Sequence, residues 1–105
     1  MSEPVVLHAE FTARPGSEDH VAQLITAYAS VVRAESGNVV FDVYRRAEAP
    51  EHFFVFEVYR DRAAFDAHLG GDAGSAFNAE LADHVTGGGS ALRFLEPASV
   101  DGWRT

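Results

Sequence analysis

A histidine among apolar residues is the first feature of this sequence that could do chemistry. His68 lies in the stretch FDAHLGG, where Phe65, His68 and Leu69 fall at positions i, i+3 and i+4 and therefore share one face of a short helix. Imidazole changes its charge near neutral pH, so His68 is a candidate general acid or base. The alternative is a structural histidine that is hydrogen-bonded to a carbonyl group in the core.

A second ionisable group, Glu57, lies in the middle of the apolar run FFVFEVY at residues 53–59. A carboxyl group in such surroundings could act as a base with a raised pKa, or could offset the charge of a protonated His68. Strand alternation, however, predicts that Glu57 points away from the helices and towards a partner subunit. An ion pair at that interface, with Arg45 or Arg93, is therefore the favoured interpretation.

Other side chains are candidates for binding a substrate. Asn38, which follows Gly37 at the start of a strand, could orient a ligand or complete the turn, and the turn is the favoured interpretation. Glu35 is expected to end the preceding helix rather than to react. Aromatic side chains could line a pocket, although such stripes more often form plain core. The aromatic candidates are Tyr28, Phe41, Tyr44, Phe56, Phe65 and Phe77.

The sequence lacks the spacings of the common cofactor sites. Its five histidines form no HxH or HExxH pattern, and His20, His52 and His84 are expected to be exposed. The stretch TGGGS has neither the lysine nor the context of a phosphate-binding loop, and there is no GxSxG nucleophile motif. We therefore expect no metal site and no nucleotide cofactor.

Composition narrows the class of protein. The chain has 105 residues, of which 47% are hydrophobic, and this predicts a single globular domain with a core over about residues 5–97 and a tail at 98–105. A net charge of −8 argues against nucleic acids and anionic membranes as partners. No apolar run reaches the length of a membrane helix, and the first ten residues lack the basic region of a signal peptide. The absence of cysteine fits a cytoplasmic location.

Hydrophobic periodicity predicts the order strand, helix, strand, strand, helix, strand. Ser17 is the expected cap of the first helix, Gly37 its left-handed end, and Asp61 the cap of a short helix. The predicted strands are 5–13, 38–46, 53–59 and 91–97, with a turn at 47–52; the predicted helical segments are about 18–34, 62–69 and 73–85. This order is typical of a ferredoxin-like α+β fold, in which helices cover one face of a four-stranded antiparallel sheet.

The third predicted strand is apolar on both faces. We expect Phe54, Phe56 and Val58 to face the helices. The opposite face would then leave apolar side chains in water, namely Val6, Phe53, Val55 and Tyr59. An exposed patch of this kind indicates a partner, and a second copy in a two-fold dimer, sheet against sheet, is the simplest one.

Four stretches in this order resemble a known family. They are ARPG after the first strand, ESGNVVFDVYR, FFVFEVYRDRAAFDAHL and LRFLEP. Together they resemble the antibiotic biosynthesis monooxygenase family of the dimeric α+β-barrel superfamily, from about residue 5 to residue 97. The resemblance implies a homodimer whose sheets pack into a barrel, and a pocket between sheet and helices in each subunit.

The resemblance also implies a range of chemistries. Characterised members include cofactor-free oxygenases of aromatic polyketides, quinol oxygenases, haem-degrading enzymes and an isomerase of a phosphorylated signalling molecule. The haem-degrading members use Asn, Trp and His at positions that hold Ala9, His68 and Leu81 here. A histidine that many members carry after the short helix is absent from the matching stretch, GGDAGSAF. A phosphorylated substrate would need basic groups, for which Arg45, Arg46 and Arg93 are the candidates.

We therefore expect a cofactor-independent monooxygenase that acts on a quinol-like or polyphenolic substrate. Such a substrate can itself donate electrons to O₂ once it is deprotonated, with His68 as the base or phenolate partner. Two alternatives stay open: a non-catalytic ligand-binding or interaction module on the same barrel, and a proton-transfer isomerase that uses the same histidine. An open aromatic cavity beneath His68 would favour an enzyme, and a filled core would favour the module.

Overall fold

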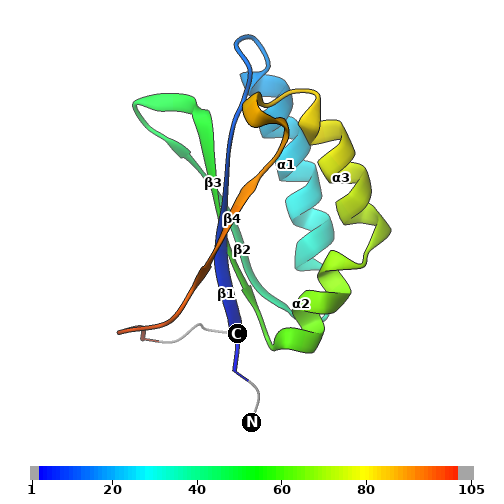
Figure 1. The fold of residues 1–105 in the computed structure, drawn as a ribbon, viewed down its shortest axis with the longest axis vertical. Coiled ribbons are helices and arrows are strands. Elements are labelled where there is room, and N and C mark those ends of the chain that lie inside the picture. Colours follow the sequence, from blue (N-terminus) through cyan, green and yellow to red (C-terminus); the bar gives the residue numbers. More distant parts are fainter. Residues whose placement is uncertain (1–2, 102–105) are drawn as a thin grey trace.

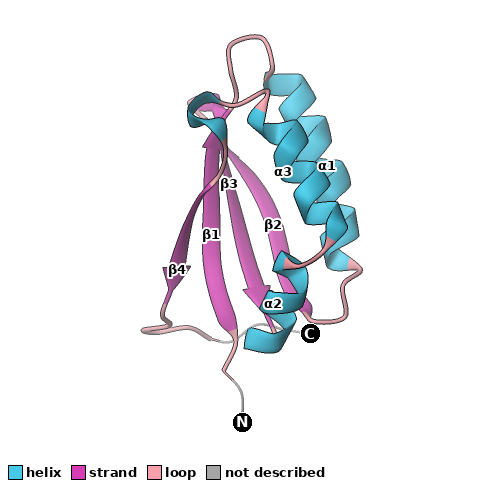
Figure 2. Ribbon diagram, turned by 45° about the vertical axis from the view of Figure 1, so that its right-hand side comes forward, coloured by secondary structure: helices cyan, strands magenta, loops and turns pink. Residues whose placement is uncertain are grey.

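The computed structural model describes residues 3–101, which form one antiparallel sheet covered on one face by helices. Four strands pair in the order β2-β3-β1-β4. Their bounds are β1 Val5–Thr12, β2 Asn38–Arg46, β3 Ala49–Tyr59 and β4 Ala91–Leu95. Figure 2 shows all three α-helices on the same side of this sheet. The predicted ferredoxin-like α+β fold is therefore confirmed.

The helices are α1 Glu18–Arg33, α2 Arg62–Leu69 and α3 Asp72–Ala82, followed by a short 3₁₀ turn, η1 Thr86–Gly88. Helices α1 and α3 lie side by side over the sheet, and α2 covers the end at which β3 finishes (Figures 1 and 2). Among the described residues, no helix is long and apolar enough to cross a membrane.

Local chemistry sets the ends of two helices. The Asp61 side chain accepts a hydrogen bond from the Ala64 N–H at 2.8 Å, which confirms it as the cap of α2. Ser17 holds the cap position of α1 without a side-chain hydrogen bond. At the other end of α1, the Arg33 guanidinium donates to the Phe41 carbonyl at 2.7 and 3.0 Å and so ties the helix to β2.

Gly37 has a role that the sequence did not predict. The described glycines with positive φ are Gly16, Gly87 and Gly88, so the expected left-handed cap at Gly37 is wrong. A Cβ at Gly37 would instead collide with the Cβ of Ala64 in α2. The glycine therefore allows β2 and α2 to approach closely, and this contact fixes the height of α2 above the sheet.

Strand β3 is longer than predicted and begins at Ala49. The turn shrinks to two residues, because Arg46 pairs with Ala49 and a register shift between Arg45 and Arg46 absorbs the extra chain. Pro50 lies beside this irregularity, where its missing N–H is tolerated and its carbonyl accepts from Arg45 Nε at 2.8 Å. Helix α3 starts and ends within a few residues of its predicted segment, and β4 stops two residues earlier than expected.

The faces of β3 are the reverse of those predicted. Phe53, Val55 and Tyr59 are buried between the sheet and the helices, whereas Phe54 and Phe56 are partly exposed on the outer face. Alternation fixes which residues share a face but not which face is covered, and both faces of this strand are apolar. Glu57, on the same face as Val55, therefore points towards the helices, and the predicted interface ion pair is wrong.

The outer face of the sheet combines apolar and charged side chains. Its Glu10 carboxylate lies 2.9 Å from His52 Nε2 and 3.4 Å from His8 Nδ1, and the ring of His8 stacks on Phe54 at 4.7 Å. At the end of the sheet where β4 finishes, Val6 and Phe56 share a shallow groove with residues 95–100. The predicted tail thus partly packs on the sheet, and its residues 102–105 lie outside the described chain.

Candidate active site

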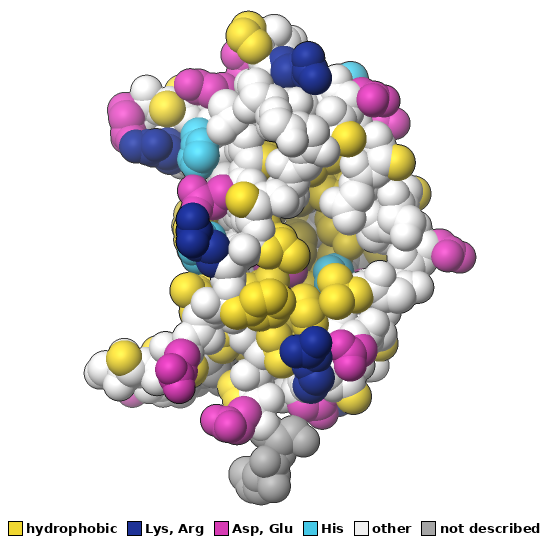
Figure 3. Space-filling model, viewed as in Figure 1, with side chains coloured by type: hydrophobic (Ala, Val, Ile, Leu, Met, Phe, Trp, Pro, Cys, Tyr) yellow, Lys and Arg dark blue, Asp and Glu magenta, His cyan; other side chains and the backbone are white. Residues whose placement is uncertain are grey.

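A cavity of about 280 Å³ lies between the inner face of the sheet and the helices. In the view of Figure 3, apolar side chains gather around a hollow beside β4. Each strand and each α-helix contributes to the wall, as does the glycine-rich stretch before β4. The lining residues are Leu7, Ala9, Phe11, Ile25, Tyr28, Phe41, Val55, Glu57, Phe65, His68, Leu69, Phe77, Asn78, Gly88, Gly89, Ser90 and Leu92. This volume lies just below the usual range for ligand pockets, about 300–1,000 Å³.

His68 enters this cavity from the last turn of α2 and is fixed by a carboxylate outside the wall. Its Nδ1 lies 3.0 and 3.2 Å from the two carboxylate oxygens of Glu35, in the segment between α1 and β2. The His68 side chain is only 10% exposed. Because a carboxylate only accepts hydrogen bonds, the proton of this contact is on Nδ1. The neutral imidazole then carries its lone pair on Nε2, the nitrogen that can take a proton from a ligand.

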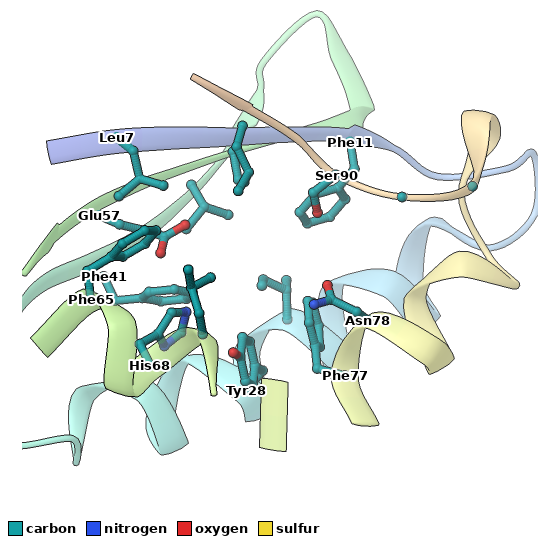
Figure 4. A pocket seen from close by; sticks show the side chains of 17 residues that line it. Leu7, Phe11, Tyr28, Phe41, Glu57, Phe65, His68, Phe77, Asn78 and Ser90 are labelled. Carbon is teal, nitrogen blue, oxygen red and sulfur yellow. The ribbon is translucent and has the colours of Figure 1, made fainter. Parts of the chain in front are cut away.

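Glu57 reaches the cavity from the middle of β3, opposite the helix layer (Figure 4). Only 6% of this residue is exposed, and Tyr59 donates a hydrogen bond from its hydroxyl to Glu57 Oε1 at 2.7 Å. Burial raises the pKa of Glu57, while the Tyr59 hydrogen bond and the nearby His68 act in the opposite direction. A carboxyl group in this state can keep its proton to higher pH than an exposed glutamate and donate it to a ligand.

The two ionisable groups share one end of the cavity. Figure 4 shows Glu57 and His68 with Phe41 and Phe65 at this end, and Phe77, Asn78 and Ser90 at the other. The Tyr59 ring also lies 4.8 Å from the His68 ring, centroid to centroid. This end of the cavity therefore combines a partnered imidazole and a buried carboxyl group within largely aromatic walls.

Tyr28 forms the floor between these two ends. Its ring stacks on Phe77 at 4.2 Å with an interplanar angle of 6° and meets the edge of Phe41 at 5.9 Å. Burial is the main cause that raises the pKa of Tyr28 to about 12, with the charges of Glu35 and Glu57 adding to it. The phenol thus stays protonated near neutral pH and offers a planar, apolar surface with a hydroxyl donor.

The mouth of the cavity is apolar and partly exposed. Leu69 and Leu92 line it and are 55% and 48% exposed, and Phe94 makes an edge contact with Phe65 at 5.5 Å. The adjoining stretch of Gly88, Gly89 and Ser90 has little side chain, so that part of the wall is mainly backbone. Such an entrance suits a flat apolar molecule with a few polar groups.

The structure brings together most of the residues singled out from the sequence. His68, Tyr28, Phe41, Phe65 and Phe77 all line the cavity.

Three candidates lie elsewhere. Tyr44 is absent from the wall and 57% exposed, so it does not line the cavity. Phe56 is on the outer face of the sheet, because β3 is reversed relative to the prediction, so its assignment to the pocket is wrong. Asn38 is absent from the wall, and its side-chain amide donates to the Val40 carbonyl at 3.0 Å. This bond at the start of β2 agrees with the structural interpretation of Asn38.

Sequence reasoning missed the role of one functional candidate and misplaced another. Glu35 was expected only to end a helix, and it lies 33 positions before the histidine that it contacts. Glu57 was considered but assigned to the wrong face. The available signal was the isolated charge in an apolar strand, which pointed to a special environment without saying on which side of the sheet that environment lay. Asn78 and Ser90 carried no signal of their own.

Comparison with known proteins decides the family. The model of the antibiotic biosynthesis monooxygenase family matches residues 4–80, which is most of the chain. The chain belongs to this family. A Mycobacterium tuberculosis protein named "Putative monooxygenase Rv0793" is 33% identical over 86 residues, which cover 82% of this chain and 84% of the relative.

Solved structures of other proteins have the same fold. The structure of Rv0793 from Mycobacterium tuberculosis superposes with a TM-score of 0.86 at 29% identity, covering 95% of this chain and 100% of that one. PA3566 from Pseudomonas aeruginosa superposes with a TM-score of 0.84 at 24% identity, covering 94% and 98%. At 24% identity, the similarity to PA3566 shows a shared fold only.

Proposed function

We propose that this member of the antibiotic biosynthesis monooxygenase family oxygenates a quinol-like or polyphenolic substrate without a metal or organic cofactor. The observation that carries the proposal is the His68–Glu35 pair at 3.0 Å, which borders an open cavity with aromatic walls. A flat phenol fits between such walls by stacking, and its hydroxyl can reach a basic nitrogen there. Membership of the family supports monooxygenase chemistry as the type of reaction.

In the proposed reaction, His68 Nε2 removes a phenolic proton from the substrate. Glu35 holds the Nδ1 proton and balances the positive charge of the imidazolium that forms. The phenolate then reduces O₂, which is why no other reductant is needed. For a quinol the balance is one quinol and one O₂ giving one hydroxyquinone and one water, with all electrons supplied by the substrate.

Glu57 acts as the proton donor in this proposal. A carboxyl group whose pKa is raised by burial can donate to a substrate oxygen, or to the oxygen atom that leaves as water. The hydroxyl of Tyr59 holds one oxygen of Glu57, Oε1, and so sets the direction of the carboxyl group. The base and the acid thus come from opposite walls of one small cavity, the base from α2 and the acid from β3.

The same base and acid, His68 and Glu57, favour a second candidate function, which is proton-transfer isomerisation. A base and an acid that line one cavity can move a proton between two atoms of a substrate without O₂. A third possibility, a ligand-binding module without turnover, would use the aromatic walls alone. The uptake of O₂ separates these functions from the proposed one.

The test is O₂ consumption by the purified chain with a panel of substituted hydroquinones and polyphenols, with and without a chelator. We expect turnover that survives the chelator and falls about 10²-fold or more in His68→Ala, the usual contribution of a positioned acid or base. His52→Ala is the matched control, because it removes a histidine–glutamate contact of similar length on the outer face. Binding of the panel without O₂ uptake would favour the module, and product isomers without O₂ uptake would favour the isomerase.

We also propose that the protein is a homodimer through the outer face of the sheet. This face leaves Phe54, Phe56 and Val40 partly exposed and Tyr44 57% exposed. Since a single helix layer covers only the inner face, a second sheet is the simplest cover for the outer one. In this proposed dimer the contacts are made by the exposed side chains of the outer face, such as Phe54 and Phe56. The buried Phe53, Val55 and Tyr59 do not take part.

A further inference from the structure

A group of three possible metal ligands lies at the surface, away from the lining of the cavity. It consists of His20 in the first turn of α1, Glu80 in the last turns of α3, and His84 just after α3. Among the residues that the structure describes, this is the group of histidine and acidic side chains whose ligand atoms all lie within 4.8 Å of one another. Figures 1 and 2 show that α1 begins beside the end of α3, which brings these distant parts of the sequence together.

The two distances from Glu80 to the histidine nitrogens are close to those between ligands of a single ion. Glu80 Oε2 lies 3.5 Å from His20 Nε2 and 3.3 Å from His84 Nε2, and the centroids of the two imidazole rings are 4.3 Å apart. Donor atoms bound to tetrahedral zinc at about 2.0–2.1 Å are roughly 3.3 Å from each other. All three ligand atoms lie within 4.8 Å of one another, so a closure of the two histidines would give three ligands to one ion.

The backbone around His84 is already fixed in place. Its N–H donates to the Leu81 carbonyl at 2.9 Å, and its carbonyl accepts from the Arg14 N–H at 2.9 Å. Glu80 is placed one helical turn before His84, so both ligands project from the same side of this segment. A metal site needs such fixed ligand positions, because otherwise the ordering of the side chains opposes binding.

We propose that His20, Glu80 and His84 bind one zinc ion, which links α1 to α3. Two imidazoles and one carboxylate are typical zinc ligands, and the partial exposure of all three leaves a fourth position for water. The chain's net charge of −8 adds a general attraction for a cation. This site is independent of the proposed oxygenase reaction, because none of the three residues lines the cavity.

The link has a structural consequence for the cavity. Glu80 is three residues beyond Phe77, whose ring stacks on Tyr28 of α1. An ion that bridges α1 and α3 would hold together two helices that both contribute to the cavity wall. Zinc should therefore stabilise the folded chain by an amount that grows with the logarithm of one plus the ratio of its concentration to its dissociation constant.

The experiment is calorimetric titration of the untagged full chain with Zn²⁺ at about pH 7.5, where imidazole in general is mostly neutral and able to bind metal. We expect one ion per chain, and an affinity that falls at least about 10-fold in His20→Ala and in His84→Ala, as for loss of supporting groups at other zinc sites. The same titration should raise the melting temperature of the wild type but not of the two variants.

His52→Ala is the matched control, since His52 and His8 flank Glu10 in a similar group on the outer face of the sheet. This variant should bind Zn²⁺ as the wild type does. Absence of saturable binding overturns the proposal, and so does wild-type affinity in His20→Ala or His84→Ala. Loss of Zn²⁺ binding in His52→Ala would place the metal site on the outer face of the sheet and would also overturn the proposal. Turnover of the quinol panel by His20→Ala reports separately on the proposed function.

Discussion

Two glutamates on opposite faces of the same sheet, Glu57 and Glu10, have pKa values that move in opposite directions. Glu57 lies on the inner face, where burial raises its pKa above the ordinary value. Glu10 lies on the outer face, where the hydrogen bond from His52 lowers its pKa, helped by the charge of His8. The residue type is the same, so the surroundings account for the difference: burial under the helix layer on one face and the histidine contacts on the other.

The same contrast holds for the two histidine–glutamate contacts. His68 meets Glu35 at 3.0 Å and His52 meets Glu10 at 2.9 Å, so the contacts are nearly equal in length. Only the first borders the cavity between the sheet and the helices, where a ligand exchanging a proton would be partly shielded from bulk water. A functional site is therefore identified here by its surroundings and not by the pair itself.

The largest expected difference is between two variants that each add a carboxylate to β3, one on the inner face and one on the outer face. Val55→Asp places a carboxylate in the core, where Val55 is 1% exposed, and should lower the free energy of unfolding by roughly 4 kcal/mol or more. Phe54→Asp places the same group on the outer face, and should leave the fold intact while dissociating the proposed dimer.

Chemical denaturation and sedimentation of both variants check this pair of outcomes. A wild-type chain that sediments as a monomer at micromolar concentration would contradict the proposed dimer. A Val55→Asp chain that unfolds like the wild type would contradict the assignment of the inner face.

The second largest effect concerns the contact that holds α2 over the inner face. Gly37→Ala forces a methyl group against Ala64 and should cost about 1–3 kcal/mol, with a shift of α2 that also lowers turnover. Gly70→Ala is the matched control, because its new Cβ would come no closer than 3.5 Å to the Asp66 carbonyl oxygen. Equal melting temperatures for the two variants would show that the close approach at Gly37 is not needed.

The third prediction compares the two carboxylates that contact histidines. Glu35→Gln should lower quinol turnover about 10-fold or more with little loss of stability, because the amide cannot balance the charge of a protonated His68. Glu10→Gln should leave turnover unchanged, since Glu10 is on the outer face. The pH dependence of turnover should also shift in Glu35→Gln, and an unaltered profile would assign Glu35 a purely structural role.

The smallest expected effect is a change in stability with pH. Burial raises the pKa of Glu57 in the folded state, so folding binds a proton and the free energy of unfolding falls as pH rises above 4.5. Glu57→Gln cannot ionise but can still accept from Tyr59. It should therefore melt higher than the wild type at about pH 8 and like the wild type below about pH 4.

Glu10→Gln should behave in the opposite way. The pKa of Glu10 is lowered in the folded state, so its contribution is present above the unfolded pKa and disappears as pH falls. Its removal should lower the melting temperature near neutral pH and have little effect in acid. Parallel pH series for both variants would contradict the difference between the two faces.

The order of elements could be predicted because it depends on local signals. Hydrophobic periods, the cap at Asp61 and the glycine-rich stretches set where helices and strands occur, and these signals lie within a few residues of their effects. The helix face that carries His68 was predicted for the same reason. The start of β3 was missed because a register shift near Arg46 admits Pro50 into the strand.

Which side chains enter the site depends on contacts between elements that are distant in the sequence. Both faces of β3 are apolar, so no local pattern could decide that Val55 and Glu57 face the helices while Phe56 faces outwards. The contact between Glu35 and His68 exists because Gly37 lets α2 approach the start of β2. These outcomes come from packing between elements, which a single sequence encodes only weakly.

The glycine-rich stretch before β4 has a consequence for protein engineering. Gly89 lines the cavity, and a Cβ built on it would meet no atom within 4 Å. Side chains introduced at this position would alter the room available to a substrate while leaving the buried core between sheet and helices untouched. Substrate size could therefore be tuned there by a small mutant library, without the loss of stability that changes at Phe41 or Phe65 would bring.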